Sequence, residues 1–396
     1  MKTDQIIALS QKYIMNTYPR MPVAPVKGKG CWLWDADGKK YLDFFSGLAV
    51  TNLGHAHPRV SYAISKQAGA LLHVSNLFQI DHQAALAEKL CQNSFADKVF
   101  FCNSGAEANE AAVKLARKWG KTHKDPDCYK IITMEGSFHG RTLAMITATG
   151  QEKIKRGFEP LIPGFQYVPF GDIVSLKEKM DNTVCAVMIE PIQGEGGVRM
   201  ASVDYFKELR SLCNEKRILL IFDEVQTGIG RTGTLFAYEQ LGIEPDIMTI
   251  AKALAGGLPV GAMLARDFVA DTFQPGDHAA TFGGNPFVTF VASTVLETLF
   301  QERLLDNVRE VGRYLRSGLE GLKKRYPFIK EVRGQGLLLG LELETEAKPL
   351  VMACLERGLI LNAAQERVLR ILPPLIVSKK EIDQGLKIMD EVFRGI

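Results

Sequence analysis

Two residues of opposite charge follow short apolar runs in the middle of the chain. Asp223 comes directly after ILLIF at positions 218–222. Lys252 is the second residue after IMTI at 247–250. Runs of this length, rich in β-branched side chains, are typical of strands buried in a parallel sheet. The carboxyl ends of such strands meet at one edge of the sheet, where ligands bind. We therefore expect the carboxylate and the amine to face one crevice.

An acid and a lysine placed in this way suit pyridoxal phosphate. This cofactor attaches to a lysine amine, and an anion keeps its ring nitrogen protonated so that the ring can accept electrons. An apolar crevice disfavours the charged form of a lysine, which makes the neutral amine available as a nucleophile. A capping role for Asp223 and a solvated Lys252 would be the plainer interpretation. The tight turn that GGLP predicts at 256–259, directly after the lysine, favours the cofactor site.

A longer pattern around these residues resembles the signature of the class III (subgroup II) pyridoxal phosphate aminotransferases. Besides the acid and the lysine it includes Leu220, Glu224, Val225, Gly228, Arg231, Gly233, Asp246, Gly256, Gly257 and Pro259. The rest of the chain is similar to the same family from end to end. The resemblance implies fold type I, an α/β fold with a mostly parallel seven-stranded sheet in a large domain and a smaller α+β lobe. It also implies a homodimer with shared active sites.

A phosphate site is predicted where the strand pattern KVFFCN at 98–103 passes into a helix pattern. Ser104 and Glu107 have the spacing of a capping box, which places Gly105 and Ala106 in the first helical turn. The free amides of a helix N-terminus bind phosphate. A well-capped structural helix would look the same, and the nearby lysine and acid favour the phosphate role. Relatives often have threonine where this chain has Ala106, a difference that would remove one possible hydroxyl contact to the phosphate.

The resemblance implies three further cofactor contacts. Phe138, in the loop EGSFHGRT at 135–142, would stack on the pyridine ring, and Gln226 would contact its phenolic oxygen. Thr281, in HAATFGGNP at 278–286, would reach the phosphate bound by the neighbouring subunit. From the residues alone, an aromatic side chain is more often core, and a threonine in a glycine-rich loop is more often a turn residue.

Five residues are expected to contact the substrates. The resemblance implies that Arg141 and Arg370 bind carboxylates, that Glu195 sits beside the pocket and can pair with an arginine, and that Tyr18 contacts the substrate. Asn76 lies in HVSNLF at 73–78, a stretch that bears on substrate choice. The implied reaction moves the terminal amino group of an N-acylated ornithine, N-acetylornithine first, to 2-oxoglutarate, a step of arginine biosynthesis. Ornithine, succinylornithine and 4-aminobutyrate are the alternative donors within the family.

Other interpretations compete with this one. His55 and His57 invite a metal site, but no third ligand is close in sequence, so no metal is expected. Glu190 and Glu195 could form a glycosidase pair, although nothing else in the sequence supports sugar chemistry. A protein that binds the cofactor without turnover is a further class. Loss of Asp223 or Lys252 would be its expected feature, and both residues are present.

Composition narrows the choice of partners. The chain has 396 residues, 46% of them hydrophobic, with 48 basic against 45 acidic residues, so it lacks the charge of a nucleic-acid binder. No apolar run approaches the ~18 residues of a membrane span, and no signal peptide is apparent. The seven scattered cysteines are typical of reduced core thiols. We expect a cytoplasmic enzyme that binds small molecules and copies of itself.

Local patterns also predict the organisation of the chain. Helical spacing covers 6–15, and CWLWDADGKKYLDF at 31–44 predicts a hairpin about Asp37 and Gly38. Further strands are expected at 129–134, 184–189 and 260–265, and helix from 286 to 326. The predicted divisions are an N-terminal segment of the small lobe at 1–53, the large cofactor-binding domain at 54–288, and a connecting helix with the C-terminal small domain at 289–396.

Overall fold

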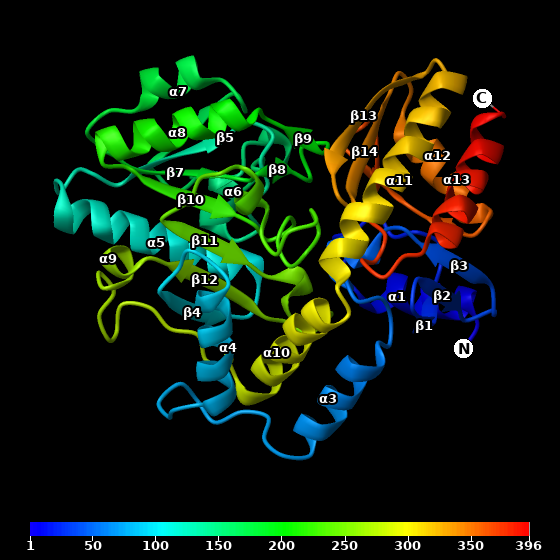
Figure 1. Cartoon of the computed structure of the whole chain (residues 1–396), viewed down its shortest axis with the longest axis horizontal. Coiled ribbons are helices and arrows are strands. Elements are labelled where there is room, and N and C mark those ends of the chain that lie inside the picture. Colours follow the sequence, from blue (N-terminus) through cyan, green and yellow to red (C-terminus); the bar gives the residue numbers. More distant parts are fainter. Residues whose placement is uncertain (396) are drawn as a thin grey trace.

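A computed structural model of the chain describes residues 1–395. A large lobe and a small lobe lie side by side, and the large one is built on a seven-stranded sheet (Figure 1). The spatial order of its strands is β4 (Lys98–Cys102), β12 (Gly261–Ala265), β11 (Ile247–Ile250), β10 (Leu219–Asp223), β7 (Val184–Ile189), β5 (Lys130–Met134) and β6 (Phe165–Val168). The strands from β11 to β6 are parallel neighbours, and β12 runs antiparallel to both of its neighbours. The mostly parallel seven-stranded sheet is therefore confirmed.

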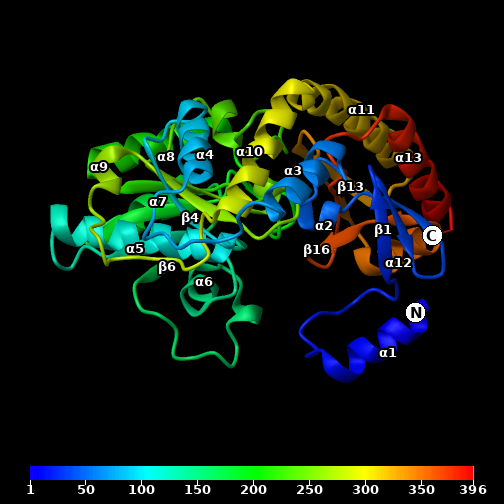
Figure 2. The ribbon, with the colours of Figure 1, turned by 90° about the horizontal axis from the view of Figure 1, so that it is seen from below.

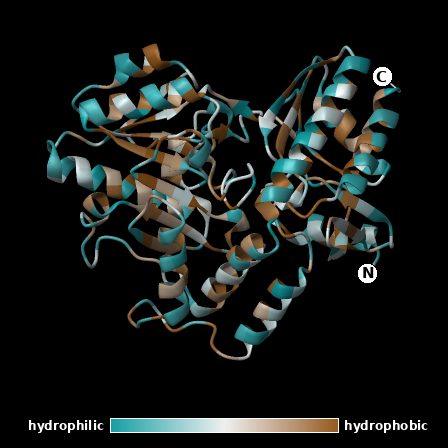
Figure 3. Ribbon diagram, viewed as in Figure 1, coloured by the Kyte–Doolittle hydropathy of each residue, from teal (hydrophilic) through white to brown (hydrophobic). Residues whose placement is uncertain are grey.

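Helices cover both faces of this sheet, which explains the continuous apolar runs of its central strands. Alternate residues of β10 enter different cores: Leu219 and Ile221 pack in the cluster that contains the middle of α5 (Gly105–His123), and Leu220 and Phe222 pack in the cluster that contains α8 (Val203–Lys216). The sheet strands carry the brown of hydrophobic residues, whereas the outer helices are largely teal (Figure 3).

The remaining elements of this lobe are short or lie at its edges. They are α4 (Asp81–Gln92), α6 (Leu143–Ala148), α7 (Ile173–Lys179), α9 (Asp267–Ala270), α10 (Pro286–Gln301), the two-stranded sheet of β8 (Ile192–Gln193) and β9 (Arg199–Met200), and the 3₁₀ helices η1 (Glu152–Ile154), η2 (Ala237–Gln240) and η3 (Lys252–Ala255).

The small lobe combines both ends of the chain. Its first sheet has the order β1 (Pro25–Lys29), β2 (Trp32–Asp35), β3 (Lys40–Asp43) and β15 (Leu359–Ile360), and its second has the order β13 (Ile329–Gln335), β14 (Leu338–Leu343), β17 (Val368–Ile371) and β16 (Asn362–Ala364). The helices are α1 (Thr3–Tyr13), α2 (Ser46–Ala49), α11 (Leu304–Arg325), α12 (Ala347–Glu356) and α13 (Lys379–Phe393), whereas α3 (Pro58–Ala68) packs against α10 of the large lobe. The parallel pairing of β15 with β3 joins the two chain ends in one sheet. The predicted division at residues 53 and 288 stays a prediction.

Most of the predicted elements form, with shifted limits. The hairpin of β2 and β3 is confirmed. Helix α1 starts and ends earlier than the predicted 6–15, and it stands apart from the body with only Thr3 buried (Figure 2). The helical stretch predicted for 286–326 is confirmed and consists of two helices, because Arg303 has φ +52° and interrupts the helical path between α10 and α11. Among residues 1–395, no helix combines the length and the apolar character needed to cross a bilayer.

Candidate active site

A cavity of about 430 Å³ lies at the carboxyl ends of the central strands, which run toward the small lobe in Figure 1. Parts of the chain that are distant in sequence form its wall: the end of β10, the turn after β11, the loop after β5 and the N-terminus of α5. Of the predicted residues, it is lined by Ser104, Gly105, Ala106, Phe138, Arg141, Glu195, Asp223, Gln226 and Lys252. The edge of the sheet therefore brings the predicted acid and lysine into one crevice, as the strand pattern implies.

Lys252 enters this cavity from a left-handed backbone position. It starts the 3₁₀ turn η3 with φ +43°, and the turn ends at Gly256 and Gly257 with φ +61° and +130°. Burial lowers the pKa of the Lys252 amine, and the positive charge of Arg370 acts in the same direction against the attraction of Glu195. A larger fraction of this amine is therefore neutral than in an exposed lysine, and the neutral amine is the nucleophilic form.

Asp223 is held from three sides at the end of β10. His139 Nδ1 and Asn109 Nδ2 donate hydrogen bonds to its Oδ2 at 2.7 and 2.8 Å, and the backbone nitrogen of Val225 donates to its Oδ1 at 3.1 Å. Only 4% of Asp223 is exposed. These donors fix the position of the carboxylate, so its Oδ1 can accept a hydrogen bond from a proton-bearing ring nitrogen opposite it.

His139 and Asn109 are site residues that the sequence patterns did not single out for this role. Both are buried, and the second lies one helical turn after Gly105 on α5. A signal for it existed, because an amide within the run AEANEAA falls on a helix face that otherwise carries small apolar residues. Nothing local distinguishes His139 from other loop histidines, since its partner Asp223 is distant in sequence.

The N-terminus of α5 lies at the cavity where the phosphate site is predicted, and its cap differs in part from a capping box. Ser104 Oγ accepts a hydrogen bond from the backbone nitrogen of Glu107 at 3.2 Å, as a capping box requires. The reciprocal bond is different, because the Glu107 carboxylate accepts from the backbone nitrogen and the side-chain amide of Asn103 at 2.5 and 2.9 Å. A Cβ on Gly105 would lie 2.7 Å from Val225, so glycine lets the helix end approach the wall of the cavity.

Phe138 is fixed by a buried carboxyl group. Its backbone nitrogen donates to Glu190 Oε2 at 3.1 Å, and Glu190 lines the same cavity with 6% exposure. Burial raises the pKa of Glu190 well above its usual range, and the nearby negative charge of Asp223 adds to this rise. The structure thus gives Glu190 a role in holding the loop that carries the aromatic ring.

An outer cavity of about 1,090 Å³ continues from the first one toward the small lobe. Phe138, Arg141 and Glu195 line both cavities, and Tyr18 and Arg370 join them in the outer one. The exposed guanidinium of Arg141 lies over the ring of Phe138, 5.6 Å from its centroid. The predicted substrate residues from both chain ends therefore meet beside the predicted cofactor residues.

Arg370 is fully buried and is held by acceptors. Its Nη1 donates to Glu195 Oε1 at 2.6 Å and to Gln226 Oε1 at 3.2 Å, and its Nε donates to Asn362 Oδ1 at 3.2 Å. Burial alone would raise the pKa of the Glu195 carboxyl group, but the charge of Arg370 outweighs it and lowers that pKa below its usual range. Glu195 is therefore an anion paired with this arginine.

Two predicted residues line neither cavity. Thr281 is exposed, and Asn76 donates from Nδ2 to the backbone oxygens of Ala280 and Gly283 at 3.1 and 2.9 Å. The two residues are thus neighbours on one surface, and Asn76 holds the loop that carries Thr281. Their roles in phosphate and substrate binding stay predictions.

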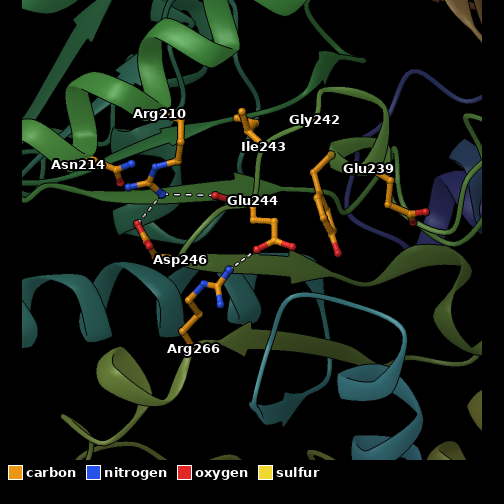
Figure 4. Close-up of a pocket in the computed structure, with 9 residues that line it drawn as sticks. Arg210, Asn214, Glu239, Gly242, Ile243, Glu244, Asp246 and Arg266 are labelled. Atoms are coloured by element: carbon orange, nitrogen blue, oxygen red, sulfur yellow. Dashed lines mark hydrogen bonds and ion pairs between the residues drawn. The ribbon is translucent and has the colours of Figure 1, made fainter.

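The other polar clusters are occupied by internal pairs. A cavity of about 680 Å³ next to the start of β11 contains Arg210 paired with Asp246 and Arg266 paired with Glu244 (Figure 4). It lies at the end of β11 opposite Lys252. His55 Nε2 contacts Asp43 Oδ2 at 2.7 Å. These charges have partners already, and none of these residues lines the cavity that contains Lys252.

The residues of the first cavity fit pyridoxal phosphate. An amine with a lowered pKa, a carboxylate with an open acceptor site, a helix N-terminus and a ring at the wall match its aldehyde, ring nitrogen, phosphate and pyridine face. Lys252, Asp223, the first turn of α5 and Phe138 are thus the groups that would hold it.

Comparisons with known proteins agree with this geometry. The family model described as aminotransferase class III matches residues 13–393. An acetylornithine aminotransferase from Caldanaerobacter subterraneus subsp. tengcongensis is 51% identical over 392 residues, which cover 99% of this chain and all of the relative.

Two solved structures have the same fold. The ornithine aminotransferase from Toxoplasma gondii has a TM-score of 0.96 at 35% identity, covering 100% of this chain and 96% of that one. The acetylornithine aminotransferase from Elizabethkingia anophelis has a TM-score of 0.90 at 34% identity, covering 100% of both chains. Over nearly its whole length, the chain thus belongs to the class III aminotransferases, pyridoxal phosphate-dependent enzymes of fold type I.

Proposed function

We propose that this enzyme transfers the terminal amino group of N-acetylornithine to 2-oxoglutarate, yielding N-acetylglutamate 5-semialdehyde and glutamate in arginine biosynthesis. The main support is the high identity to acetylornithine aminotransferases over the full chain. The cavities add a physical reason, because cationic Arg141 and Arg370 lie in one outer cavity. Two guanidinium groups match the two carboxylates of glutamate and of 2-oxoglutarate.

Each residue of the cavity has its own role in the proposed reaction. When bound, the cofactor supplies the aldehyde that takes up the donor's amino group and the ring that accepts the electrons of the broken C–H bond. Lys252 would attach the cofactor, and its Nζ, as a free amine, would accept the proton that leaves the donor carbon. Asp223 keeps the ring nitrogen protonated. Arg141 binds the carboxylate of the donor, and Phe138 orients the ring from one side.

A homodimer with shared sites is part of this proposal. Thr281 lies away from the cavity of its own chain, and large apolar side chains are exposed near it: Leu77 is 91% exposed, Phe78 67% and Phe282 61%. A contact with a second copy would cover this apolar surface and place Thr281 near the other cavity. A cytoplasmic location is also proposed, because six of the seven cysteines are buried as free thiols, which is typical of proteins in a reducing compartment.

A panel of amino donors tests the proposed substrate. N-acetylornithine, ornithine, N-succinylornithine and 4-aminobutyrate are each supplied with 2-oxoglutarate, and the glutamate formed gives kcat/KM. We expect N-acetylornithine to have the highest value. The Lys252→Ala variant is the matched control for background transfer. If another donor has a higher kcat/KM, that donor is the substrate and the proposal of N-acetylornithine is wrong.

A further inference from the structure

The two carboxylate oxygens of Asp223 accept different numbers of hydrogen bonds, two on Oδ2 and one on Oδ1. An ionised carboxylate has about four lone-pair sites, two on each oxygen. His139 Nδ1 and Asn109 Nδ2 occupy both sites on Oδ2, at 2.7 and 2.8 Å. The Val225 backbone nitrogen takes one site on Oδ1 at 3.1 Å. One acceptor site therefore stays open, and it is on Oδ1.

Asn109 can present only a donor to Asp223. Its Nδ2 also donates to the backbone oxygen of His139 at 2.8 Å, and its Oδ1 accepts from Thr249 Oγ1 at 2.6 Å. A flipped amide would bring its oxygen against the carboxylate and a carbonyl, both of which are acceptors only. Because Thr249 is the direct neighbour of Asp223 across strands β11 and β10, the whole chain of bonds is tied to the sheet.

Helix α5 also carries Gly105, which lines the cavity at the predicted phosphate site. Asn109 lies four residues after Gly105, a rise of about 6 Å along α5, and Gly105 is at the helix N-terminus that faces the cavity. One rigid element thus holds both the anion cradle and a donor to the carboxylate. A shift of α5 would move both together.

We propose that Asn109 is a positioning residue for Asp223: with His139 it saturates Oδ2 and leaves Oδ1 as the acceptor for the protonated ring nitrogen of the cofactor. Thr249 supports it by satisfying the amide oxygen, which is otherwise buried without a donor. The proposal rests on the proposed function only in taking the chain to be an aminotransferase that binds pyridoxal phosphate.

Three variants of the full-length protein separate positioning from simple packing. Asn109→Ala removes the donor to Oδ2. Thr249→Val removes the hydroxyl group but keeps the shape, and Thr249→Ser is its matched control because it keeps the hydroxyl group. Each is loaded with pyridoxal phosphate that carries an isotope label at the ring nitrogen. The NMR shift of that nitrogen reports its protonation in the absence of any amino donor, and the melting temperature of the cofactor-free protein reports packing.

We expect the ring-nitrogen signal to move toward its unprotonated position in Asn109→Ala and, less strongly, in Thr249→Val, because a carboxylate that is no longer held in place makes a poorer hydrogen bond to the protonated ring nitrogen. The half-reaction with glutamate should slow about tenfold or more in Asn109→Ala. Thr249→Ser should match the parent in both respects. A parental ring-nitrogen signal in both Asn109→Ala and Thr249→Val, with only a lower melting temperature, would overturn the proposal. If Asn109→Ala does not fold, Thr249→Val against Thr249→Ser decides alone. A wrong choice of amino donor appears only in the donor panel, so the two failures are distinguishable.

Discussion

The guanidinium group of Arg370 lies 2.6 Å from the carboxylate of Glu195, and the two residues are 175 positions apart in the chain. Arg370 comes from β17 of the small lobe, whereas Glu195 follows β8 beside the large sheet. Arg370 Nη2 is buried and has no hydrogen-bond partner within residues 1–395. An arginine in this position needs an anion, since an unpaired buried charge is costly.

We expect this pair to open and close with the substrate. An acylated ornithine has no second carboxylate at the transferred end, so Glu195 stays on Arg370, whereas glutamate and 2-oxoglutarate displace it. In Glu195→Ala the arginine is permanently free, and the half-reaction rate with glutamate should rise relative to that with N-acetylornithine. Single-turnover spectroscopy of both half-reactions in both proteins measures this ratio. An unchanged ratio would mean that Glu195 has only a structural role in its turn.

Lys252 should be the attachment point of the cofactor, because burial lowers the pKa of its amine inside the cavity. Lys252→Ala should bind pyridoxal phosphate noncovalently and lose turnover. Borohydride reduction followed by peptide mapping of the parent protein should place the cofactor on this lysine. A label on a different lysine would refute the site assignment as a whole.

Asp223→Asn should keep the fold and much of the cofactor affinity but lose most of the activity, because an amide cannot keep the ring nitrogen protonated. The loss in kcat should exceed about tenfold, equivalent to about 1.4 kcal/mol of barrier. Steady-state kinetics and the cofactor dissociation constant are measured together, with the melting temperature as the control for folding. Turnover within tenfold of the parent would argue against the electron-sink role.

Thr281 should act across a subunit boundary, because it is exposed and lines neither cavity of its own chain. Mixed dimers of a Lys252→Ala chain and a Thr281→Ala chain should contain one native-like and one doubly damaged site. Activity of the mixture should therefore exceed the average of the two parent variants. Activity that follows the content of intact lysine alone would indicate a site contained in one chain.

Glu224 should make stability fall as pH rises. Burial raises the pKa of this carboxyl group from the ordinary 4.5 to about 7 despite bonds from the Ala237 and Tyr238 backbone nitrogens. Between these values the folded state binds a proton that the unfolded state has lost, so the free energy of unfolding decreases with pH by up to about 3 kcal/mol. The loss is complete above about pH 7.

Glu224→Gln tests this pH dependence, because it cannot ionise. Denaturant unfolding of the cofactor-free parent and variant at about pH 5 and about pH 8 gives the change in unfolding free energy with pH. In the variant, the unfolding free energy should lack the part of the pH dependence that Glu224 contributes. The loss of one carboxylate acceptor can lower the stability of the variant, but by the same amount at both pH values. Parallel pH profiles for the two proteins would contradict the raised pKa.

The chain's local patterns were sufficient to place the central parts of the fold and site. The apolar runs before Asp223 and Lys252 are β10 and β11, because strands buried on both faces must be apolar throughout. The rule that ligands bind at the carboxyl ends of such strands then put the acid and the lysine in one crevice, where the structure has them. Ser104 likewise marks the start of α5 through its local capping chemistry.

Tertiary structure alone decided the contacts between elements distant in sequence. Nothing near Asn109 or Thr249 indicates that they bond to each other, and the spacing of Asn76 gives no sign that it holds the 280–283 loop. Hydrogen bonds of this kind depend on how helices and strands pack. A polar side chain on a buried face has the same local pattern whichever distant partner satisfies it.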